Sequence, residues 1–211
     1  MDRREFTRRA LIAAAAGLSS PFELNAAPRA KLKAIAFDAF ALLDPRPIFS
    51  LAESLYPGKG MELSNAWRTR QFEYQWLRAM SGTYADFWQV TEDALIFSGK
   101  LVGLELSRAN RSQLMEGYLQ MNVWPDVPQA LEVLRRAEIR LAFLSNATLN
   151  ILQSAIRNAN LEGSFEHVIS TDQIRNYKPA PRAYQLAIDA FGLKKEEIGF
   201  VAFAGWDAAD D

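Results

Sequence analysis

Apolar and polar positions alternate along the chain with two different periods. Four short apolar runs have the length of buried strands, and they lie at residues 33–37, 141–144, 167–170 and 198–203. Between these runs, apolar residues recur every three or four positions, which predicts helices after residue 126 and from Pro181 to Gly192. Strands that alternate with helices are typical of a parallel sheet. We therefore predict an α/β fold built on a doubly wound parallel sheet.

The segment from Ile48 to about Gln120 carries helical signals and no strand alternation. It follows the first predicted strand and two prolines, which break the chain. We predict a helical cap at residues 47–123, inserted into a Rossmann-like core formed by residues 28–46 and 124–211.

The first 27 residues have the order of an export signal. Arg3 and Arg4 precede an alanine-rich apolar run, Ala10–Leu18, which is too short to span a bilayer. The paired arginines resemble the twin-arginine signal, so we expect residues 1–27 to be removed and the mature protein to be periplasmic. The twin-arginine export machinery is then a partner. The alternative is an amphipathic N-terminal helix whose arginines are paired by chance.

The composition limits the chemistry that this chain can perform. Lys and Arg number 24 and Asp and Glu number 25, a net charge of −1, so there is no basic excess to bind nucleic acid. The chain has no Cys, and His167 is its single His, which excludes disulfides, thiolate sites and a multi-histidine metal site. Catalysis must rest on carboxylates, lysine, arginine, hydroxyls and the backbone.

Polar residues follow each of the four predicted strands. Asp38 ends the first strand, Ser145 and Asn146 end the second, Lys178 lies after the third and Asp207 after the fourth. Ligands of doubly wound sheets bind beyond the carboxyl ends of the strands. Two carboxylates, a lysine and a hydroxyl at one sheet edge therefore predict a reaction site. The Ser145-Asn146 pair also suits a helix N-cap, and we expect it to serve both roles.

Six short segments occur in the order found in a known enzyme family. They are Phe37–Phe40, Trp67–Leu77, Thr91–Leu95, Leu144–Asn146, Tyr177–Pro179 and Gly205–Asp207. Together they resemble the haloacid dehalogenase superfamily, and most closely its (S)-2-haloacid dehalogenases, from about Lys33 to Asp207. The resemblance implies the doubly wound sheet with its helical cap. It also implies hydrolysis of a carbon–halogen bond in a small 2-halocarboxylate by water, without a cofactor.

One position separates dehalogenases from the phosphatases of the same superfamily. The phosphatases carry a second Asp two residues after the nucleophile, where it protonates the leaving alcohol and helps to organise Mg²⁺. Phe40 stands at that position, and a phenyl ring can neither donate a proton nor bind a metal. A halide leaves without a proton, so we predict a dehalogenase with no metal site and disfavour a Mg²⁺-dependent phosphatase.

The resemblance assigns the chemical steps to particular residues. It implies that Asp38 attacks the carbon bearing the halogen and forms an ester, which water hydrolyses to a 2-hydroxy acid. It implies that Lys178 keeps Asp38 ionised, that Tyr184 supports this cluster, and that Asp207 positions or activates the water. Arg68 is expected to receive the departing halide.

The resemblance also implies which residues bind the substrate. Ser145 and Asn146 are expected to hold the substrate carboxylate, and Phe87 to form an apolar wall. Phe40 and Trp206 complete the expected binding set. Other aromatic residues of the cap are expected in its core, and these are Trp67, Phe72, Tyr74 and Trp76.

Several positions depart from the family pattern. Leu42 replaces a threonine beside the nucleophile, Ala202 and Ala204 replace a serine and an asparagine that order nucleophile and water, and Thr69 replaces a glutamine. Each lost buried hydrogen bond costs about 1–3 kcal/mol, so the alternative is an impaired relative that binds small carboxylates. The family continues past the fourth strand, so we expect a core truncated after Asp211. The oligomeric state stays open, with a homodimer as one alternative.

Overall fold

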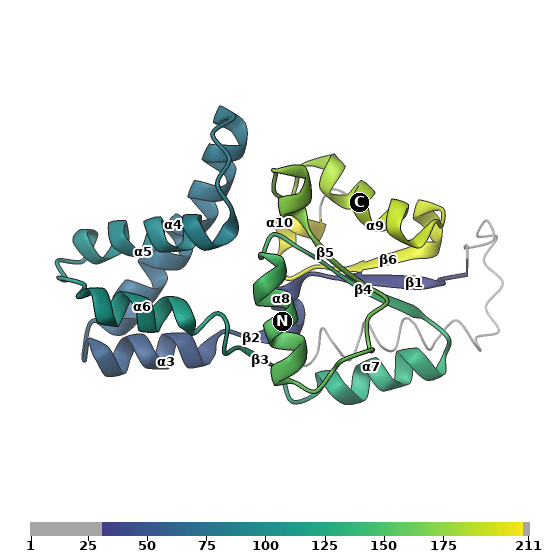
Figure 1. Cartoon of the computed structure of the whole chain (residues 1–211), viewed down its shortest axis with the longest axis horizontal. Helices are drawn as coiled ribbons and strands as arrows, with labels where there is room; N and C mark the ends of the chain where they lie inside the picture. Colours follow the sequence, from purple (N-terminus) through teal and green to yellow (C-terminus); the bar gives the residue numbers. More distant parts are fainter. Residues whose placement is uncertain (1–30, 209–211) are drawn as a thin grey trace.

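A four-stranded parallel sheet forms the centre of the larger layer of the molecule (Figure 1). The computed structural model describes residues 31–208, so the predicted signal at residues 1–27 lies outside the described residues. The sheet has the order β5–β4–β1–β6, and its strands are β1 (Ala34–Phe37), β4 (Arg140–Ser145), β5 (His167–Ser170) and β6 (Ile198–Val201). All three neighbouring pairs are parallel. The predicted α/β fold is confirmed, although β6 ends at Val201 and not at residue 203.

Helices cover both faces of this sheet, because side chains along a strand point alternately to its two sides. The helices are α7 (Val127–Arg136), α8 (Leu149–Asn158) and α9 (Pro181–Phe191). Ile35 and Phe37 pack in a cluster with apolar residues of α7 and α8, whereas Ala34 and Ala36 pack with Ala187 and Phe191 of α9. Figure 1 shows α7 and α9 on opposite sides of the sheet. The predicted helix from Pro181 to Gly192 is confirmed, with Gly192 in the left-handed conformation at its end.

Four helices form a second layer beside the sheet, and we call this layer the cap (Figure 1). They are α3 (Arg46–Leu55), α4 (Gly60–Ser81), α5 (Phe87–Leu101) and α6 (Arg108–Glu116). Two short antiparallel strands, β2 (Leu43–Asp44) and β3 (Asn122–Val123), pair where the chain enters and leaves the cap. Within residues 31–208, none of the helices has both the length and the apolar character needed to cross a bilayer.

Buried polar contacts fix α4 against α5 inside the cap. The indole N–H of Trp67 donates to the Thr91 carbonyl at 2.8 Å. The Gln71 amide donates to the Thr91 hydroxyl at 2.5 Å and to the Tyr118 hydroxyl at 3.2 Å. Burial raises the pKa of Tyr118 to about 12, so its hydroxyl stays protonated at neutral pH. Trp67 belongs to the core, as predicted.

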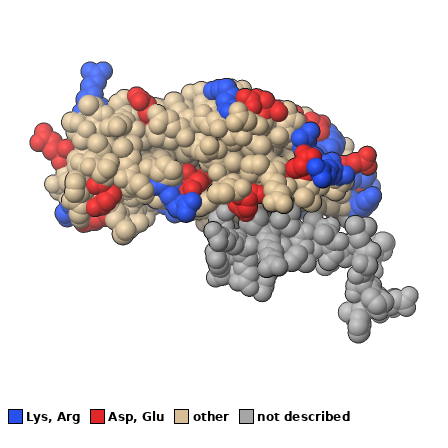
Figure 2. Space-filling view, turned by 90° about the horizontal axis from the view of Figure 1, so that it is seen from below, with Lys and Arg blue, Asp and Glu red and all other residues tan. Residues whose placement is uncertain are grey.

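Charged side chains are interspersed on the surface drawn in Figure 2. Acidic and basic residues lie close to one another there, in keeping with the near balance of 24 basic and 25 acidic residues in the sequence. Some acidic and basic side chains pair three or four positions apart in the sequence, as in the salt bridge of Lys59 with Glu62 and that of Arg136 with Glu132. Exposed pairs of this kind contribute little to stability.

The prediction that Ser145 and Asn146 cap a helix is wrong. Helix α8 begins at Leu149, and Thr148 occupies the N-cap position. The Ser145 hydroxyl accepts a hydrogen bond from the Ala147 backbone N–H at 3.1 Å, within the turn that precedes the helix. The two residues therefore belong to the end of strand β4 and its turn, at the edge of the site described below.

Helix α3 lies very close to the start of α4 at Gly60. A Cβ atom on Gly60 would lie 2.2 Å from the backbone N and Cα of Glu53 in α3, closer than any real contact. We expect Gly60→Ala to lower the free energy of unfolding by about 1–3 kcal/mol or more, because one backbone must move away from the other. Thermal unfolding measures the effect, at about 2–4 °C per kcal/mol for a domain of this size.

Gly205→Ala is the matched control for this substitution. An added Cβ meets nothing within 4 Å there, so this variant should unfold close to the wild-type temperature. Equal unfolding temperatures for the two variants would contradict the close approach of α3 and α4.

Candidate active site

Asp38 stands at the point where the first strand ends and a short helix begins. It is the N-cap of α2 (Ala39–Leu42), and its Oδ1 accepts the Phe40 backbone N–H at 2.8 Å. Only 7% of the residue is exposed. The cap interaction fixes the carboxylate in one orientation, and the helix N-terminus favours its negative charge.

The ammonium of Lys178 joins the ends of two strands. Its Nζ donates to Asp38 Oδ2 and to Asp207 Oδ2, both at 2.6 Å, and the side chain is completely buried. Asp207 lies in the short helix α10 (Gly205–Ala208), which follows β6. The parallel sheet thus brings together three charged residues that are up to 169 positions apart in the sequence.

Tyr184 extends this cluster from helix α9. Its hydroxyl donates to Asp207 Oδ1 at 2.6 Å. Burial raises the pKa of Asp207 above its usual value, and the charge of Lys178 and the two hydrogen bonds from Lys178 and Tyr184 oppose that rise. The net charge of Asp38, Lys178 and Asp207 is −1 when all three are ionised, and none of the three is left without a partner.

Two adjoining cavities lie between this charged cluster and the cap. The first, of about 20 Å³, contains the carboxylates, and its lining residues are Asp38, Phe40, Gln71, Phe72, Gln75, Phe87, Ser145, Asn146, Phe203, Trp206 and Asp207. The second, of about 30 Å³, is lined by Arg68, Ser64 and others. Four residues line both cavities, and they are Phe40, Gln71, Phe72 and Phe203. Arg68 and Asp38 therefore line different cavities, and three of the residues shared by the two cavities are aromatic.

Arg68 stacks on an aromatic ring of the core. Its guanidinium carbon lies 5.1 Å from the centre of the Phe203 ring, within the range of a cation–π interaction. Phe203 in turn packs against Phe40, with ring centres 6.0 Å apart, and Phe40 packs against Phe87 at 6.1 Å. An arginine, an aromatic wall and a carboxylate thus lie in sequence across the two cavities.

The amide of Asn146 is fully engaged within the protein. Its Oδ1 accepts the Lys178 backbone N–H at 2.8 Å and the Thr171 hydroxyl at 3.1 Å. Its Nδ2 donates to Gln75 Oε1 at 3.0 Å and to the Lys178 carbonyl at 3.4 Å. Asn146 therefore orients the lysine loop and the cap, and its amide has no hydrogen left for a ligand. Within residues 31–208, by contrast, the Ser145 hydroxyl accepts from the Ala147 N–H and donates to no acceptor, so its hydrogen can be donated to a ligand.

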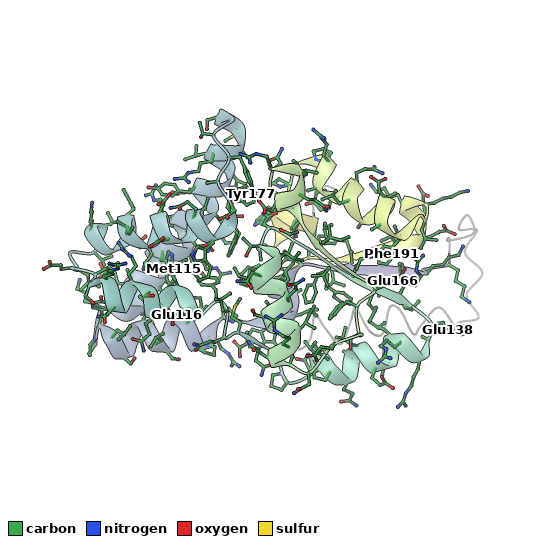
Figure 3. All side chains as sticks on the ribbon, viewed as in Figure 1. Met115, Glu116, Glu138, Glu166, Tyr177 and Phe191 are labelled. Carbon is green, nitrogen blue, oxygen red and sulfur yellow. The ribbon has the colours of Figure 1, made fainter. Side chains whose placement is uncertain are left out.

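Aromatic residues join the cap to the core at the edge of the site. The ring of Trp206 packs against Phe72 and Trp76 of α4, with ring centres 6.0 Å and 5.3 Å apart. The expectation that Phe72 and Trp76 belong to the cap core is wrong, since Phe72 lines both cavities and Trp76 reaches the Lys178 carbonyl at 3.3 Å. Tyr177, labelled in Figure 3 where α4 approaches the core, donates its hydroxyl to the Ala85 carbonyl at 2.6 Å.

The carboxylates of this site do not fit a magnesium ion. Within residues 31–208 there is no group of three or more acidic or His side chains that could hold a metal. Asp38 and Asp207 face each other across the Lys178 ammonium, which takes the position between them that a cation would need. Phe40 lies in contact with two other rings. A hard cation that prefers six oxygen ligands has too few of them here.

Sequence reasoning missed Gln75, which lines the carboxylate cavity and is 1% exposed. The helical spacing of this segment could have predicted its position. Arg68, Phe72 and Gln75 stand at positions 0, +4 and +7 and therefore share one face of α4. Phe203 was also missed, because it lies in a loop after β6, where the apolar residues follow neither a helical nor a strand periodicity.

Comparison with known proteins agrees with this arrangement. The family model of haloacid dehalogenase-like hydrolases matches residues 13–202. Haloacetate dehalogenase H-2 of Moraxella sp. (strain B) is 40% identical over 180 residues, which are 85% of this chain and 80% of that protein. The (S)-2-haloacid dehalogenase of Pseudomonas sp. (strain YL) is 39% identical over 178 residues, 84% of this chain and 77% of that protein.

A solved structure extends the comparison to three dimensions. The L-2-haloacid dehalogenase from Xanthobacter autotrophicus, solved with chloropropionic acid covalently bound, superposes with a TM-score of 0.78 at 37% identity. The match covers 85% of this chain and 73% of that chain. The similarity therefore includes both the core and the cap.

The hydrogen bond from Tyr184 to Asp207 gives a testable electrostatic prediction. Tyr184→Phe removes a donor that lowers the pKa of Asp207, so that pKa should rise further above its usual value. When the pKa of a carboxyl group is higher in the folded state than in the unfolded state, its ionised form lowers the stability of the protein at neutral pH. This loss of stability becomes smaller as the pH falls through the folded-state pKa, and it is absent below the unfolded-state pKa. The variant should therefore lose more stability at pH 7 than at acid pH.

Carboxyl ¹³C NMR titration of Asp207 measures the shift directly. Tyr56→Phe serves as the control, because the Tyr56 hydroxyl accepts a hydrogen bond from Asn110 within the cap and lies outside both cavities. An Asp207 pKa that is unchanged or lower in Tyr184→Phe would show that the hydroxyl does not stabilise the carboxylate.

Proposed function

The chain belongs to the haloacid dehalogenase-like hydrolases, and from this premise we propose that it converts short 2-haloacids into 2-hydroxy acids. The proposal rests above all on Asp38, a carboxylate held by Lys178 and by a backbone N–H while facing a small aromatic cavity. Its supports are the dehalogenase relatives, at 40% and 39% identity, and the covalent chloropropionate adduct of a similar structure.

In the first step, Asp38 displaces the halide. A carboxylate oxygen of Asp38 forms a bond to C2 of the acid while the carbon–halogen bond breaks and the halide leaves with its electron pair. The Lys178 ammonium pairs with the nucleophilic carboxylate at 2.6 Å and holds it in place. No proton is required at the leaving group, which agrees with the phenyl ring of Phe40 at the position where a phosphatase needs an acid.

The halide leaves toward Arg68 in this proposal. The cavity that contains Arg68 adjoins the one that contains Asp38, and Phe40, Phe72 and Phe203 line both. A halide moving between them passes along apolar rings and reaches a guanidinium on the far side. Both cavities are small, at about 20 and 30 Å³.

In the second step, water attacks the carbonyl carbon of the Asp38 ester and releases the 2-hydroxy acid. Asp207 is placed to orient or activate this water, since it lines the same cavity and its burial raises its pKa, which makes it a better proton acceptor. The complete reaction consumes one water and releases one halide and one proton. Ser145 contributes a hydroxyl to the substrate carboxylate, and Asn146 acts by orienting its neighbours.

Three replaced residues support the proposal that ester hydrolysis is the slow step. Leu42 is buried in the short helix that Asp38 caps and offers only an apolar side chain, and Ala202 and Ala204 provide no side-chain donors after β6. Displacement needs the nucleophile and substrate to be held at about 3–3.5 Å. Hydrolysis needs in addition an ordered water and a stabilised oxyanion, for which each donor is worth about 2.7–4 kcal/mol. We propose that turnover is limited by the second step.

Incubation with the two enantiomers of 2-chloropropionate, followed by halide assay and intact mass, tests the function. We expect the (S)-enantiomer to give a burst approaching one halide per site and then a much slower steady state. The protein should gain the mass of the acid minus halide, and Asp38→Asn should abolish both the burst and the adduct.

Other outcomes of the same assay point elsewhere. Rapid multiple turnover without an adduct would show that other groups replace the missing donors. A folded protein that releases no halide from either enantiomer would favour a protein that binds small carboxylates. Chelator-sensitive hydrolysis of a phosphate monoester would instead revive the phosphatase alternative.

The N-terminal arginines support a separate proposal, that the protein is exported by the twin-arginine route and acts in the periplasm. Its basis is the order of Arg3, Arg4 and the alanine-rich run in the sequence. We expect cell fractionation to find the mature protein outside the cytoplasm, with a new N-terminus near Ala27 or Pro28. Changing Arg3 and Arg4 to Lys should retain it in the cytoplasm; uncleaved cytoplasmic wild-type protein would refute the proposal.

A further inference from the structure

Gln75 carries an unsatisfied donor at the centre of the molecule. The residue belongs to α4 and is 1% exposed. Its Oε1 accepts a hydrogen bond from Asn146, whereas its Nε2 is buried and has no hydrogen-bond partner among the described residues. A buried donor without a partner is costly, so its presence needs a reason.

The orientation of this amide is fixed by a chain of hydrogen bonds. The backbone N–H of Lys178 can only donate, so the Asn146 atom that it contacts must be Oδ1. The other end of the Asn146 amide is then the donor Nδ2, and the Gln75 atom facing it at 3.0 Å must be the acceptor Oε1. Gln75 cannot be reversed without setting two donors against each other. Its remaining end is therefore an N–H₂ group.

The carboxylate cavity is where this free end can find an acceptor. Gln75 lines that cavity together with Asp38, Ser145 and Asp207. The two carboxylates already accept hydrogen bonds from Lys178, Phe40 and Tyr184. The guanidinium of Arg68 lines the adjoining cavity, beyond the aromatic wall. The polar donors Ser145 and Gln75 thus stand at one end of the combined space and the halide-receiving arginine at the other.

We propose that Gln75 Nε2 donates a hydrogen bond to the carboxylate of the bound acid and selects carboxylates over neutral carboxamides. This inference rests on the proposed function, for which it names the group that recognises the acid end of the substrate. A neutral amide suits this position, because it binds the anion without placing a second cation beside Asp38 to weaken the nucleophile. Since Asn146 of the core orients Gln75 of the cap, recognition requires the two layers to be together.

Gln75→Glu tests the inference with almost no change of shape. The variant keeps the oxygen that accepts from Asn146 and replaces only the free N–H₂ group by a carboxylate oxygen. Calorimetric titration with propionate and with propionamide measures binding without any chemistry. We expect propionate affinity to fall by about ten- to a hundredfold, and propionamide affinity to be kept or improved, because its N–H₂ group can donate to the new oxygen.

Gln113→Glu on the exposed surface of α6 is the matched control, and both ligands should bind it as they bind the wild type. Equal loss of propionate and propionamide affinity in Gln75→Glu would assign Gln75 a merely structural role and overturn the inference. Unchanged propionate affinity, or wild-type protein that binds no propionate, would also overturn it. Failure of the proposed function gives a different result. In that case Gln75→Glu would still prefer propionamide to propionate, as the inference expects, but the wild type would release no halide from any 2-haloacid.

Discussion

The buried ammonium of Lys178 is the interaction on which the rest of the site depends. Asp38 and Asp207 come from the ends of two neighbouring strands, and without a cation between them two carboxylates would face each other in a nearly dry space. Removing one member of such a buried group costs about 3–5 kcal/mol, because it leaves the other charges uncompensated. The lysine therefore stabilises the folded protein and, in the proposed function, also the nucleophile.

The loop that carries Lys178 is itself held by both layers of the molecule. The amide of Asn146, at the end of β4, contacts the backbone N–H and the carbonyl of Lys178, and Trp76 of the cap reaches the same carbonyl. Tyr177 donates to the Ala85 carbonyl, just before α5. The cap is thus part of the structure that fixes the ammonium, and it also separates the carboxylates from bulk water, where their attraction to Lys178 would be weaker.

The sequence predicted those features that depend on local period or on topology. Apolar runs gave the four strands, and the rule that ligands bind beyond the carboxyl ends of parallel strands located Asp38, Lys178 and Asp207 correctly in one cluster. The sequence did not predict those site residues whose position depends on the orientation of the cap relative to the core. Phe72 was expected in the cap core and Gln75 was missed, because helical spacing shows which residues share a face but not what that face meets.

The separation of Arg68 from Asp38 matters to the proposed chemistry, in which Asp38 is the nucleophile and Arg68 receives the halide. If the guanidinium paired directly with Asp38, it would compete with the substrate for the carboxylate and would not be available for the halide. Lys178 occupies the Asp38 carboxylate instead, and the Phe203 ring holds the guanidinium at the far side of the aromatic wall. In the proposed displacement, negative charge passes from the Asp38 carboxylate, which lies beside Lys178, to the departing halide, which approaches Arg68. In the proposed chemistry, the aromatic rings that line both cavities form the path of the halide from Asp38 to Arg68.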